Sequence, residues 1–277
     1  MLDAQAQTGL QRSCGGAEVV LGGRDGRPRL TRLHQSGAAK VFLPRHADAE
    51  AIFLNTAGGL TDGDQLRFGL HLTAPLRFTA TTQTAERAYA SRGLPARLDI
   101  EMRACAGAAL DWLPQETILF EDARLRRDTD IHLDGDAALL LCETVMIGRH
   151  AMGEAPRRAR LQDRRRVWRD GRLAWMESLE IGDLALAQAR HPALLGAARC
   201  FATIAFLAPG APDRAPGLRP ALWADGCDTA LSAWDGRLIL RLAAREIWPL
   251  RLHLARLLTL LRGRAMPRVW QMNGDLT

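Results

Sequence analysis

Three consecutive segments of this chain repeat one pattern: an alternating strand, a turn of small residues, a second strand and a polar pair. The three units begin at His71, Glu101 and His132, about 30 residues apart. A repeat of this length is typical of structural units that stack and bury a shared core. Apolar residues at every second position indicate half-buried β-strands. We therefore expect a mainly β protein of layered, stacked sheets with long strands and few helices.

The loop over residues 55–64, Asn-Thr-Ala-Gly-Gly-Leu-Thr-Asp-Gly-Asp, lies between two predicted strands. Its glycines permit close backbone approach, and Asp62 and Asp64 place carboxylates there. A phosphate-binding loop would end in Gly-Lys-Ser/Thr before a helix, whereas this loop ends at Asp64 before a strand. The ligand spacing of a calcium loop is also absent. Two interpretations remain: a functional carboxylate, or an ordinary turn with solvated aspartates.

Charge and cysteine content limit the class of protein. The chain has 277 residues and a formal charge of +6, and nearly all of its positive charge is arginine. This charge permits acidic partners, but it does not by itself indicate nucleic-acid binding. The five cysteines include no CxxC pair, which argues against a structural zinc site or a disulfide framework. No apolar leader or run of membrane-spanning length occurs. We expect a reduced, cytoplasmic protein.

The composition of the sequence changes after Asp183, where an Ala/Leu-rich stretch begins. We expect a loose N-terminal segment (1–15), a β body (16–183) and a small C-terminal α+β lobe (184–277) packed on the body.

Within the lobe, the Ala/Leu-rich stretch Leu184–Ala198 is predicted to be helical apart from an interruption at His191-Pro192. A hairpin is predicted around Asp235-Gly236. Leucines at helical spacing predict a helix over Pro249–Arg262, ended by Gly263.

An arginine-rich stretch covers Arg157–Arg172, and its Asp170-Gly171 pair predicts a two-residue hairpin turn. One interpretation is an exposed hairpin with a solvated arginine face. The other is a contact surface for an acidic partner, which would use Arg164, Arg165 and Arg166.

Motifs of catalysis are absent from the sequence. No Gly-x-Ser-x-Gly elbow, His-Glu-x-x-His pair or dinucleotide-binding fingerprint occurs. The seven histidines are scattered and do not fall at the spacing of helical metal ligands. We expect a protein that is not an enzyme and holds no permanent cofactor.

Carboxylates stand at strand ends and in loops along the chain. Glu143 follows the apolar run Ala137–Cys142, and a carboxylate beside a buried strand must be paired, hydrated or protonated. Several such groups lining a wet interior would form a path for a hydrated divalent cation, because carboxylates are hard ligands that hold late transition metals weakly. The alternative is that each carboxylate is separately solvated or paired with arginine. The set comprises Asp64, Glu86, Glu116, Glu121, Glu143, Glu154 and Glu177.

Six segments, taken in order, resemble the UreD family of urease accessory proteins, also called UreH. The resemblance extends over nearly the whole chain, and its longest segment is Trp-Leu-Pro-Gln-Glu-Thr-Ile-Leu-Phe at 112–120. The six are Asn55–Leu60, Gly63-Asp64, Thr81–Gln83, Trp112–Phe120, Gly148-Arg149 with Met152–Glu154, and Pro267–Trp270.

The resemblance implies a predominantly β, non-enzymatic scaffold that binds urease apoprotein and the helical accessory protein UreF. UreF in turn recruits the GTPase UreG, and the assembly delivers nickel(II) to urease through an internal tunnel. Carried over by position, the transient nickel path would use Asp64, Glu143 and Glu177, with Glu86 beside it. The ending at Trp270 suggests a surface for the helical partner.

Two other classes stay open at this stage. One is an arginine-rich nucleic-acid-binding β protein, whose binding would weaken steeply with salt. The other is a carbohydrate-acting enzyme, which would need two carboxylates at a fixed separation in an open cleft.

Overall fold

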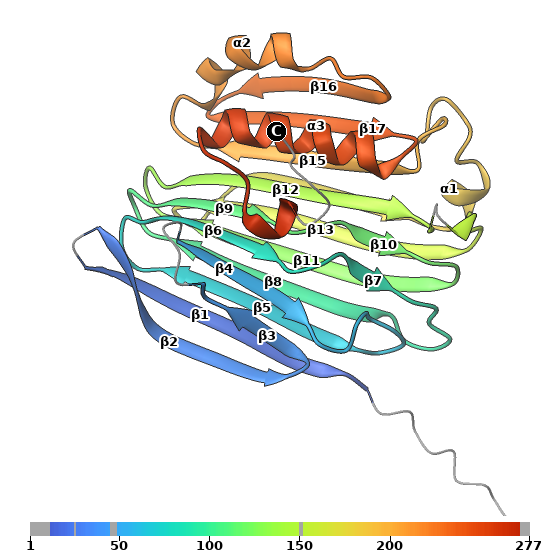
Figure 1. Cartoon of the computed structure of the whole chain (residues 1–277), viewed down its shortest axis with the longest axis horizontal. Coiled ribbons are helices and arrows are strands. Elements are labelled where there is room, and N and C mark those ends of the chain that lie inside the picture. The colour runs from blue at the N-terminus through green and yellow to red at the C-terminus, as the bar shows by residue number, and fades with distance from the viewer. Residues whose placement is uncertain (1–11, 25, 45–48, 150–151, 272–277) are drawn as a thin grey trace, which may run out of the picture.

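Two β-sheets stacked face to face make up most of this computed structural model (Figure 1), which describes residues 12–24, 26–44, 49–149 and 152–271. The first sheet has seven strands. In spatial order they are β14 (Arg172–Ile181), β13 (Ala159–Arg169), β11 (Ala123–Leu133), β8 (Ala96–Ala104), β5 (Gln65–Leu72), β1 (Cys14–Arg24) and β2 (Arg27–Gly37).

The second sheet has ten strands, and the short β7 (Glu86–Ala88) and β10 (Thr117–Leu119) join it beside β12. The other eight, in spatial order, are β16 (Cys227–Trp234), β17 (Arg237–Ala244), β15 (Cys200–Leu207), β12 (Ala138–Ile147), β9 (Ala109–Leu113), β6 (Arg77–Thr82), β4 (Glu50–Asn55) and β3 (Ala39–Phe42). The helical elements are α1 (Asp183–Ala187), η2 (Ala211–Arg214), α2 (Ala215–Leu218), η3 (Arg219–Ala221), α3 (Ile247–Arg262) and η4 (Arg268–Gln271).

The chain alternates between the two sheets, so each repeat adds one parallel strand to both. In the first sheet Gln65 pairs with Arg97, and Arg97 with Arg126, which are offsets of 32 and 29 residues. In the second sheet Arg77 pairs with Ala109, and Ala109 with Ala138, at the same offsets. The predicted stacking of units of about 30 residues is therefore confirmed, as is the mainly β fold with few helices.

Inward-facing side chains form rows that cross the strands in register. One row runs from β1 to β14 and is apolar throughout, which is how a closed core is built from strands at period two. Its members are Val19, Leu70, Met102, Ile131, Val167 and Trp175, and all are buried.

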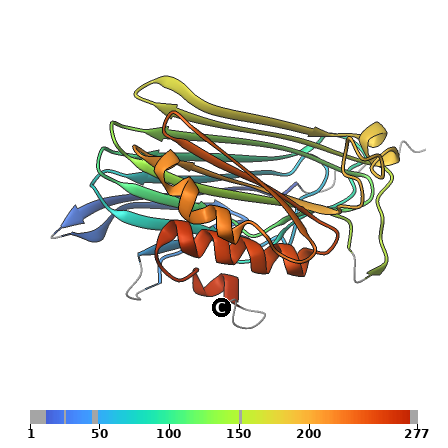
Figure 2. The same ribbon diagram turned by 90° about the horizontal axis from the view of Figure 1, so that it is seen from above.

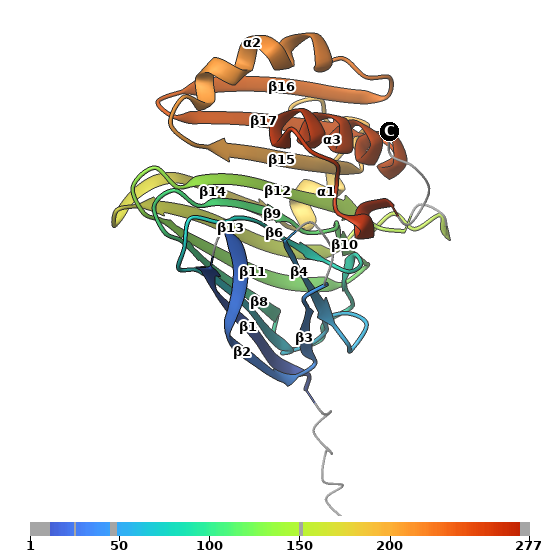
Figure 3. The ribbon, with the colours of Figure 1, turned by 60° about the vertical axis from the view of Figure 1, so that its left-hand side comes forward.

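The lobe strands β15, β17 and β16 continue the ten-stranded sheet beyond β12 (Figures 1 and 3), past the edge of the other sheet. Helix α3 covers these strands on the face turned away from the seven-stranded sheet (Figure 2). It buries Leu250, Leu254, Leu257, Leu258 and Leu261 there. Gly263, at φ 64°, ends the helix in the left-handed conformation that glycine adopts without strain, so this predicted helix and its stop are confirmed.

The prediction of a helix over Leu184–Ala198 is largely wrong. Helix α1 spans only Asp183–Ala187, and turns follow it. Pro192 has no amide hydrogen and disfavours helical backbone at the residue before it, and Gly196 has φ 58°. The Ala/Leu composition therefore did not decide the local structure. The division of the chain at residues 183 and 184 stays a prediction, and residues 1–11 of the expected loose segment lie outside the described residues.

Two glycines with the same backbone conformation give a matched stability test. Gly148 has φ 73°, and a Cβ built on it would lie 2.5 Å from Cδ of Pro156 and 2.7 Å from the carbonyl oxygen of Glu154. Gly171, in the β13–β14 turn, has φ 74°, and a Cβ there would meet nothing within 4 Å. Gly171→Ala should cost about 1 kcal/mol from backbone strain alone. Gly148→Ala should cost at least about 2 kcal/mol, and equal losses in urea unfolding would contradict the steric argument.

Candidate functional site

Two rows of inward-facing side chains change from apolar to charged across the strands of the seven-stranded sheet. The first passes from Leu66 and Leu98 to Arg127 and Asp163. The second ends at Arg165 and Glu177, after Phe68, Ile100 and Thr129. The interior between β11, β13 and β12 is therefore ionic, although the rest of the same rows is a hydrophobic core.

Arg127 lies at the centre of this buried ionic cluster, with only 2% of its side chain exposed. Its guanidinium donates two hydrogen bonds to Asp163, from Nε at 2.9 Å and from Nη2 at 2.6 Å. Nη1 lies 2.6 Å from Oε2 of Glu143 and donates to Thr117 at 3.0 Å. A bidentate pair with a second carboxylate fixes the guanidinium plane strongly.

Arg165 continues the cluster toward the surface. It donates to Asp163 and, from Nη1, to Glu177 at 2.6 Å. Glu177 also accepts a hydrogen bond from Nη2 of Arg241 at 2.8 Å. The side chain of Glu177 is 14% exposed and that of Arg241 is 60% exposed, so the ionic chain reaches solvent at this end.

A groove of about 440 Å³ opens beside Glu177 and Arg241, between the edge strand β14 and the lobe strands β15, β17 and β16. Its walls include Leu179, Phe201 and Ala243. Arg237 of β17 also joins the lobe to β14, by donating to the carbonyl oxygen of Ala174 at 2.6 Å. The buried ionic cluster thus connects to a surface groove at one defined place.

The two innermost carboxyls differ in how firmly they hold their negative charge. Burial by itself would raise the pKa of Asp163, but the charges of Arg127 and Arg165 outweigh it and lower this pKa to about 2. Burial raises the pKa of Glu143 above its ordinary value, and the opposing charges of Arg127 and Arg165 do not cancel this effect. Asp163 is therefore the fixed anion of the cluster, and Glu143 takes up a proton more readily.

Glu143 also contacts the other sheet. Its Oε1 accepts a hydrogen bond from the indole Nε1 of Trp112 at 2.9 Å. Both its oxygens therefore have a donor or a cation beside them, and its side chain has no solvent exposure. This geometry fits a carboxylate paired with arginine.

Breaking this contact tests how much the cluster contributes to folding. Glu143→Leu leaves the Trp112 indole without a partner and removes one of the two carboxylates beside Arg127, and should cost about 3–5 kcal/mol in urea unfolding. Glu143→Gln keeps an acceptor for the Trp112 indole and a polar group beside Arg127, so it should cost less than Glu143→Leu. A Glu143→Leu variant as stable as the parent chain would contradict a structural role for the pair.

Glu86 lies beside the cluster, on the short strand β7. It accepts a hydrogen bond from Nδ2 of Asn55 at 3.2 Å, and the same oxygen is 3.2 Å from the amide nitrogen of Arg87. Burial raises the pKa of Glu86 to about 7, against these hydrogen bonds and the charges of Arg87 and Arg127. It borders a cavity of about 20 Å³, which has room for one water molecule.

The raised pKa of Glu86 makes stability depend on pH. Because the folded pKa is about 7 and the ordinary value is 4.5, the folded chain binds more protons between these pH values. The contribution of Glu86 to the free energy of unfolding is therefore fully present below about pH 4.5, and it is lost as pH rises through about 7. In Glu86→Gln, the free energy of unfolding should decrease with pH by up to about 3 kcal/mol less than in the parent chain. Urea unfolding at about pH 5 and about pH 8 measures it, with the exposed Glu180→Gln as control; identical pH dependence in both variants would contradict the assignment.

Asp64 is buried but lies outside the ionic cluster. Its carboxylate accepts hydrogen bonds from the backbone amides of Ser13 at 2.7 Å and Thr61 at 2.9 Å. It therefore closes the loop that precedes β5 and ties it to the start of β1. Within the described residues, no hydrogen bond or ion pair joins it to Glu86, Glu143 or Glu177.

The three consecutive arginines of the hairpin point in alternate directions. Arg165 is buried, whereas Arg164 and Arg166 lie on the outer face and pair with Asp128 at 2.8 Å and Asp130 at 2.6 Å. The arginine run is therefore not one continuous positive face.

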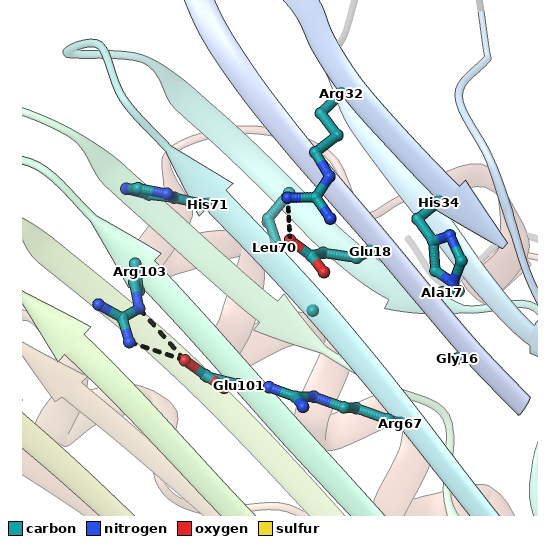
Figure 4. A pocket seen from close by; sticks show the side chains of 11 residues that line it. Gly16, Ala17, Glu18, Arg32, His34, Arg67, Leu70, His71, Glu101 and Arg103 are labelled. Atoms are coloured by element: carbon teal, nitrogen blue, oxygen red, sulfur yellow. Dashed lines mark hydrogen bonds and ion pairs between the residues drawn. The ribbon is translucent and has the colours of Figure 1, made fainter.

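The same outer face carries a depression over Gly69, of about 410 Å³ (Figure 4). Glu18 and Glu101 lie on either side of it, and Arg67, Arg103 and His71 surround them. Acidic and basic groups alternate there as well, so phosphate groups would meet carboxylates alongside arginines.

Trp270 is buried in the lobe. Its Nε1 donates to the carbonyl oxygen of Leu113 at 3.1 Å, and the Arg251 guanidinium lies 5.0 Å from its ring centre. Arg251 also donates to the backbone oxygen of Trp270 and pairs with Glu116 at 3.1 Å. The indole therefore fastens the C-terminal segment to the second sheet.

Sequence reasoning missed Arg127, Asp163 and Trp112 as members of the cluster. Asp163 stands inside the arginine run, for which the sequence alone predicts an exposed hairpin. A signal was present, because Leu161 and Val167 fix the inward face of β13, and period two then places Asp163 and Arg165 inward as well.

No three His, Cys, Asp or Glu side chains gather closely enough to hold a metal ion anywhere in the ranges that the structure describes. The same ranges contain no helix long and apolar enough to cross a membrane. Carboxylates and guanidiniums in balance, with no imidazole or thiolate among them, do not form a tight site for a transition metal.

Fold and cluster together define a class: a layered β scaffold with an ionic interior that opens into a groove at its edge. Comparison with known sequences makes the assignment specific. The family described as UreD urease accessory protein matches residues 13–271, so the chain belongs to this family, whose members are non-catalytic scaffolds of urease maturation.

Individual relatives match this chain over 96% or more of their length. The chain is 46% identical over 274 residues to the urease accessory protein UreD of Paracoccus denitrificans, covering 98% of this chain and 97% of the relative. It is 51% identical over 265 residues to UreD of Cereibacter sphaeroides (95% and 96%) and 39% identical over 275 residues to UreD of Rhizobium leguminosarum bv. trifolii (98% and 100%). The predicted resemblance is confirmed.

Proposed function

We propose that this chain is a cytoplasmic scaffold that binds urease apoprotein, UreF and UreG, and that nickel(II) passes along its ionic interior on the way to urease. One observation carries the proposal: a continuous series of contacts runs from the groove at Arg241 and Glu177, through Arg165 and Asp163, to Arg127 and Glu143. Family membership supplies the link to urease maturation.

The cost of this interior supports a function beyond folding. Removing charged groups from water is expensive, and well-packed apolar residues stabilise a core at least as well as a buried ion network. The neighbouring rows of this core are apolar, so the same scaffold could be filled without charges. We therefore propose that this buried network also serves the passage of an ion.

The chemistry of the cluster suits brief contact with nickel(II). Carboxylate oxygens bind this cation less firmly than imidazole or thiolate. Each carboxylate already has a guanidinium partner, so an arriving cation competes with arginine and leaves again when the arginine returns. Glu177, shared by two arginines, is the carboxylate of the ionic cluster that borders the groove. Glu86 borders the route, whereas Asp64 would act by holding the loop before β5.

Partner contacts are proposed for the outer surface. Arg164 and Arg166 remain partly exposed beside their aspartates and can steer an acidic partner during association. Arg165 and Trp270 are buried, so we propose that they support partner binding by holding the hairpin and the C-terminal segment in place.

Glu177→Gln tests the route, because the amide keeps the shape of the side chain but not its charge. Urease matured with this variant should contain less nickel, by about half or more, while co-purification of the accessory complex stays intact. Glu180→Gln is the matched control, since Glu180 lies on the same strand and is exposed. Fully nickel-loaded urease from the Glu177→Gln complex would overturn the route at this residue.

A further inference from the structure

Helix α3 carries a stripe of exposed side chains on the face opposite to its buried leucines. Trp248, Leu252, Arg256 and Leu260 follow each other at intervals of four residues, which places them on one side of a helix. All four are exposed, and Trp248 has 41% of its surface accessible. Within the described residues, no element covers this side of α3 (Figures 1 and 2).

A second tryptophan belongs to the same surface. Trp223 is 75% exposed, just after η3. The preceding Leu222 packs against the hydrophobic cluster that contains the buried leucines of α3. A Cβ on Gly226 would lie 3.8 Å from Pro249, so the segment that carries Trp223 runs beside the helix. We call Trp223, Trp248, Leu252, Arg256 and Leu260 the α3 patch.

The net charge of the protein is concentrated in this part of the chain. Residues 184–277 contain 12 arginines and 6 acidic residues, a formal charge of +6, whereas residues 1–183 contain equal numbers of basic and acidic residues. Arg256 has no ion-pair partner among the described residues, and Arg219 and Arg245 are exposed as well. In the β body, by contrast, the exposed arginines of the outer sheet face largely pair with aspartate or glutamate.

We propose that the α3 patch is a docking surface for an acidic partner helix that lays an apolar stripe along α3. Tryptophan, leucine and arginine together form the type of surface on which a few residues carry most of the binding energy. The spacing of four residues fits the ridges of a helix packed against a helix. An excess of arginine around an apolar centre selects an acidic rim on the partner.

Two other occupants fit these observations less well. A second copy of this chain would bring its own charge of +6 onto the same patch. The phosphates of duplex DNA could pair with the arginines, but DNA offers no apolar surface for Trp248, Leu252 and Leu260. The inference rests on the proposed function, because it takes the partner to be a member of the maturation complex. The helical accessory protein UreF is the probe for the test.

The experiment titrates the full-length chain with purified UreF at about 50 mM and about 300 mM salt, where screening differs strongly. Arg256→Glu and the double variant Trp248→Ala, Leu252→Ser should each weaken binding about tenfold or more, and the parent complex should weaken as salt rises. Two controls should bind like the parent chain. Leu184→Glu changes an apolar side chain that is 81% exposed on α1, and Arg160→Glu changes an arginine of the outer sheet face that is 64% exposed.

The outcomes separate this inference from the proposed function. If the parent chain binds UreF and both patch variants bind equally well while their thermal unfolding is unchanged, the docking surface is wrong and the proposed function stands. The inference would also be overturned if the parent chain and the two controls bound duplex DNA tightly and the patch variants did not. If the parent chain binds neither UreF nor urease apoprotein, the proposed function itself fails.

Discussion

The bidentate contact between Arg127 and Asp163 is the interaction on which the interior of this protein depends. Both side chains are almost fully removed from water, on adjacent parallel strands, at positions where the neighbouring strands carry leucine. A guanidinium left alone there would be far more costly than any single cavity. Asp163 holds two arginines, and these in turn fix Glu143 on the opposite sheet and Glu177 at the edge. One carboxylate therefore organises contacts across both sheets.

The repeat architecture determines where such a network can lie. Each unit places equivalent positions in register, so a row of inward side chains changes character only when the sequence of one unit differs from the others. From β1 to β8 the rows are apolar and the core is closed. From β11 to β14 two of these rows carry charge, and the lobe strands extend past β14 there, leaving a groove. The ionic interior lies where the stack ends, which gives it access to solvent.

Much of this fold could be predicted from the sequence, because period-two alternation and a repeat of constant length are local signals. The strands, the hairpin at Asp235-Gly236 and helix α3 follow from such signals. The helix predicted after Asp183 failed because alanine and leucine content says little when proline and glycine interrupt the backbone. The pairing of Arg127 with Asp163 depends on the register between β11 and β13, 36 residues apart, which no local pattern contains. Glu143 could be recognised as a buried carboxylate, but its partner could not.

The two halves of the protein use arginine in opposite ways. In the β body, basic and acidic residues occur in equal number, and arginines pair in ladders on the outer sheet face and in a network inside. Each buried carboxylate has an arginine beside it, so the charges of the interior balance. In the lobe, two arginines hold the C-terminal segment through Asp111, while others remain exposed around an apolar helix face. Balanced charge suits an interior that exchanges partners, whereas excess charge of one sign suits a surface that attracts them. The proposed ion route and the proposed docking surface therefore lie in different parts of the protein.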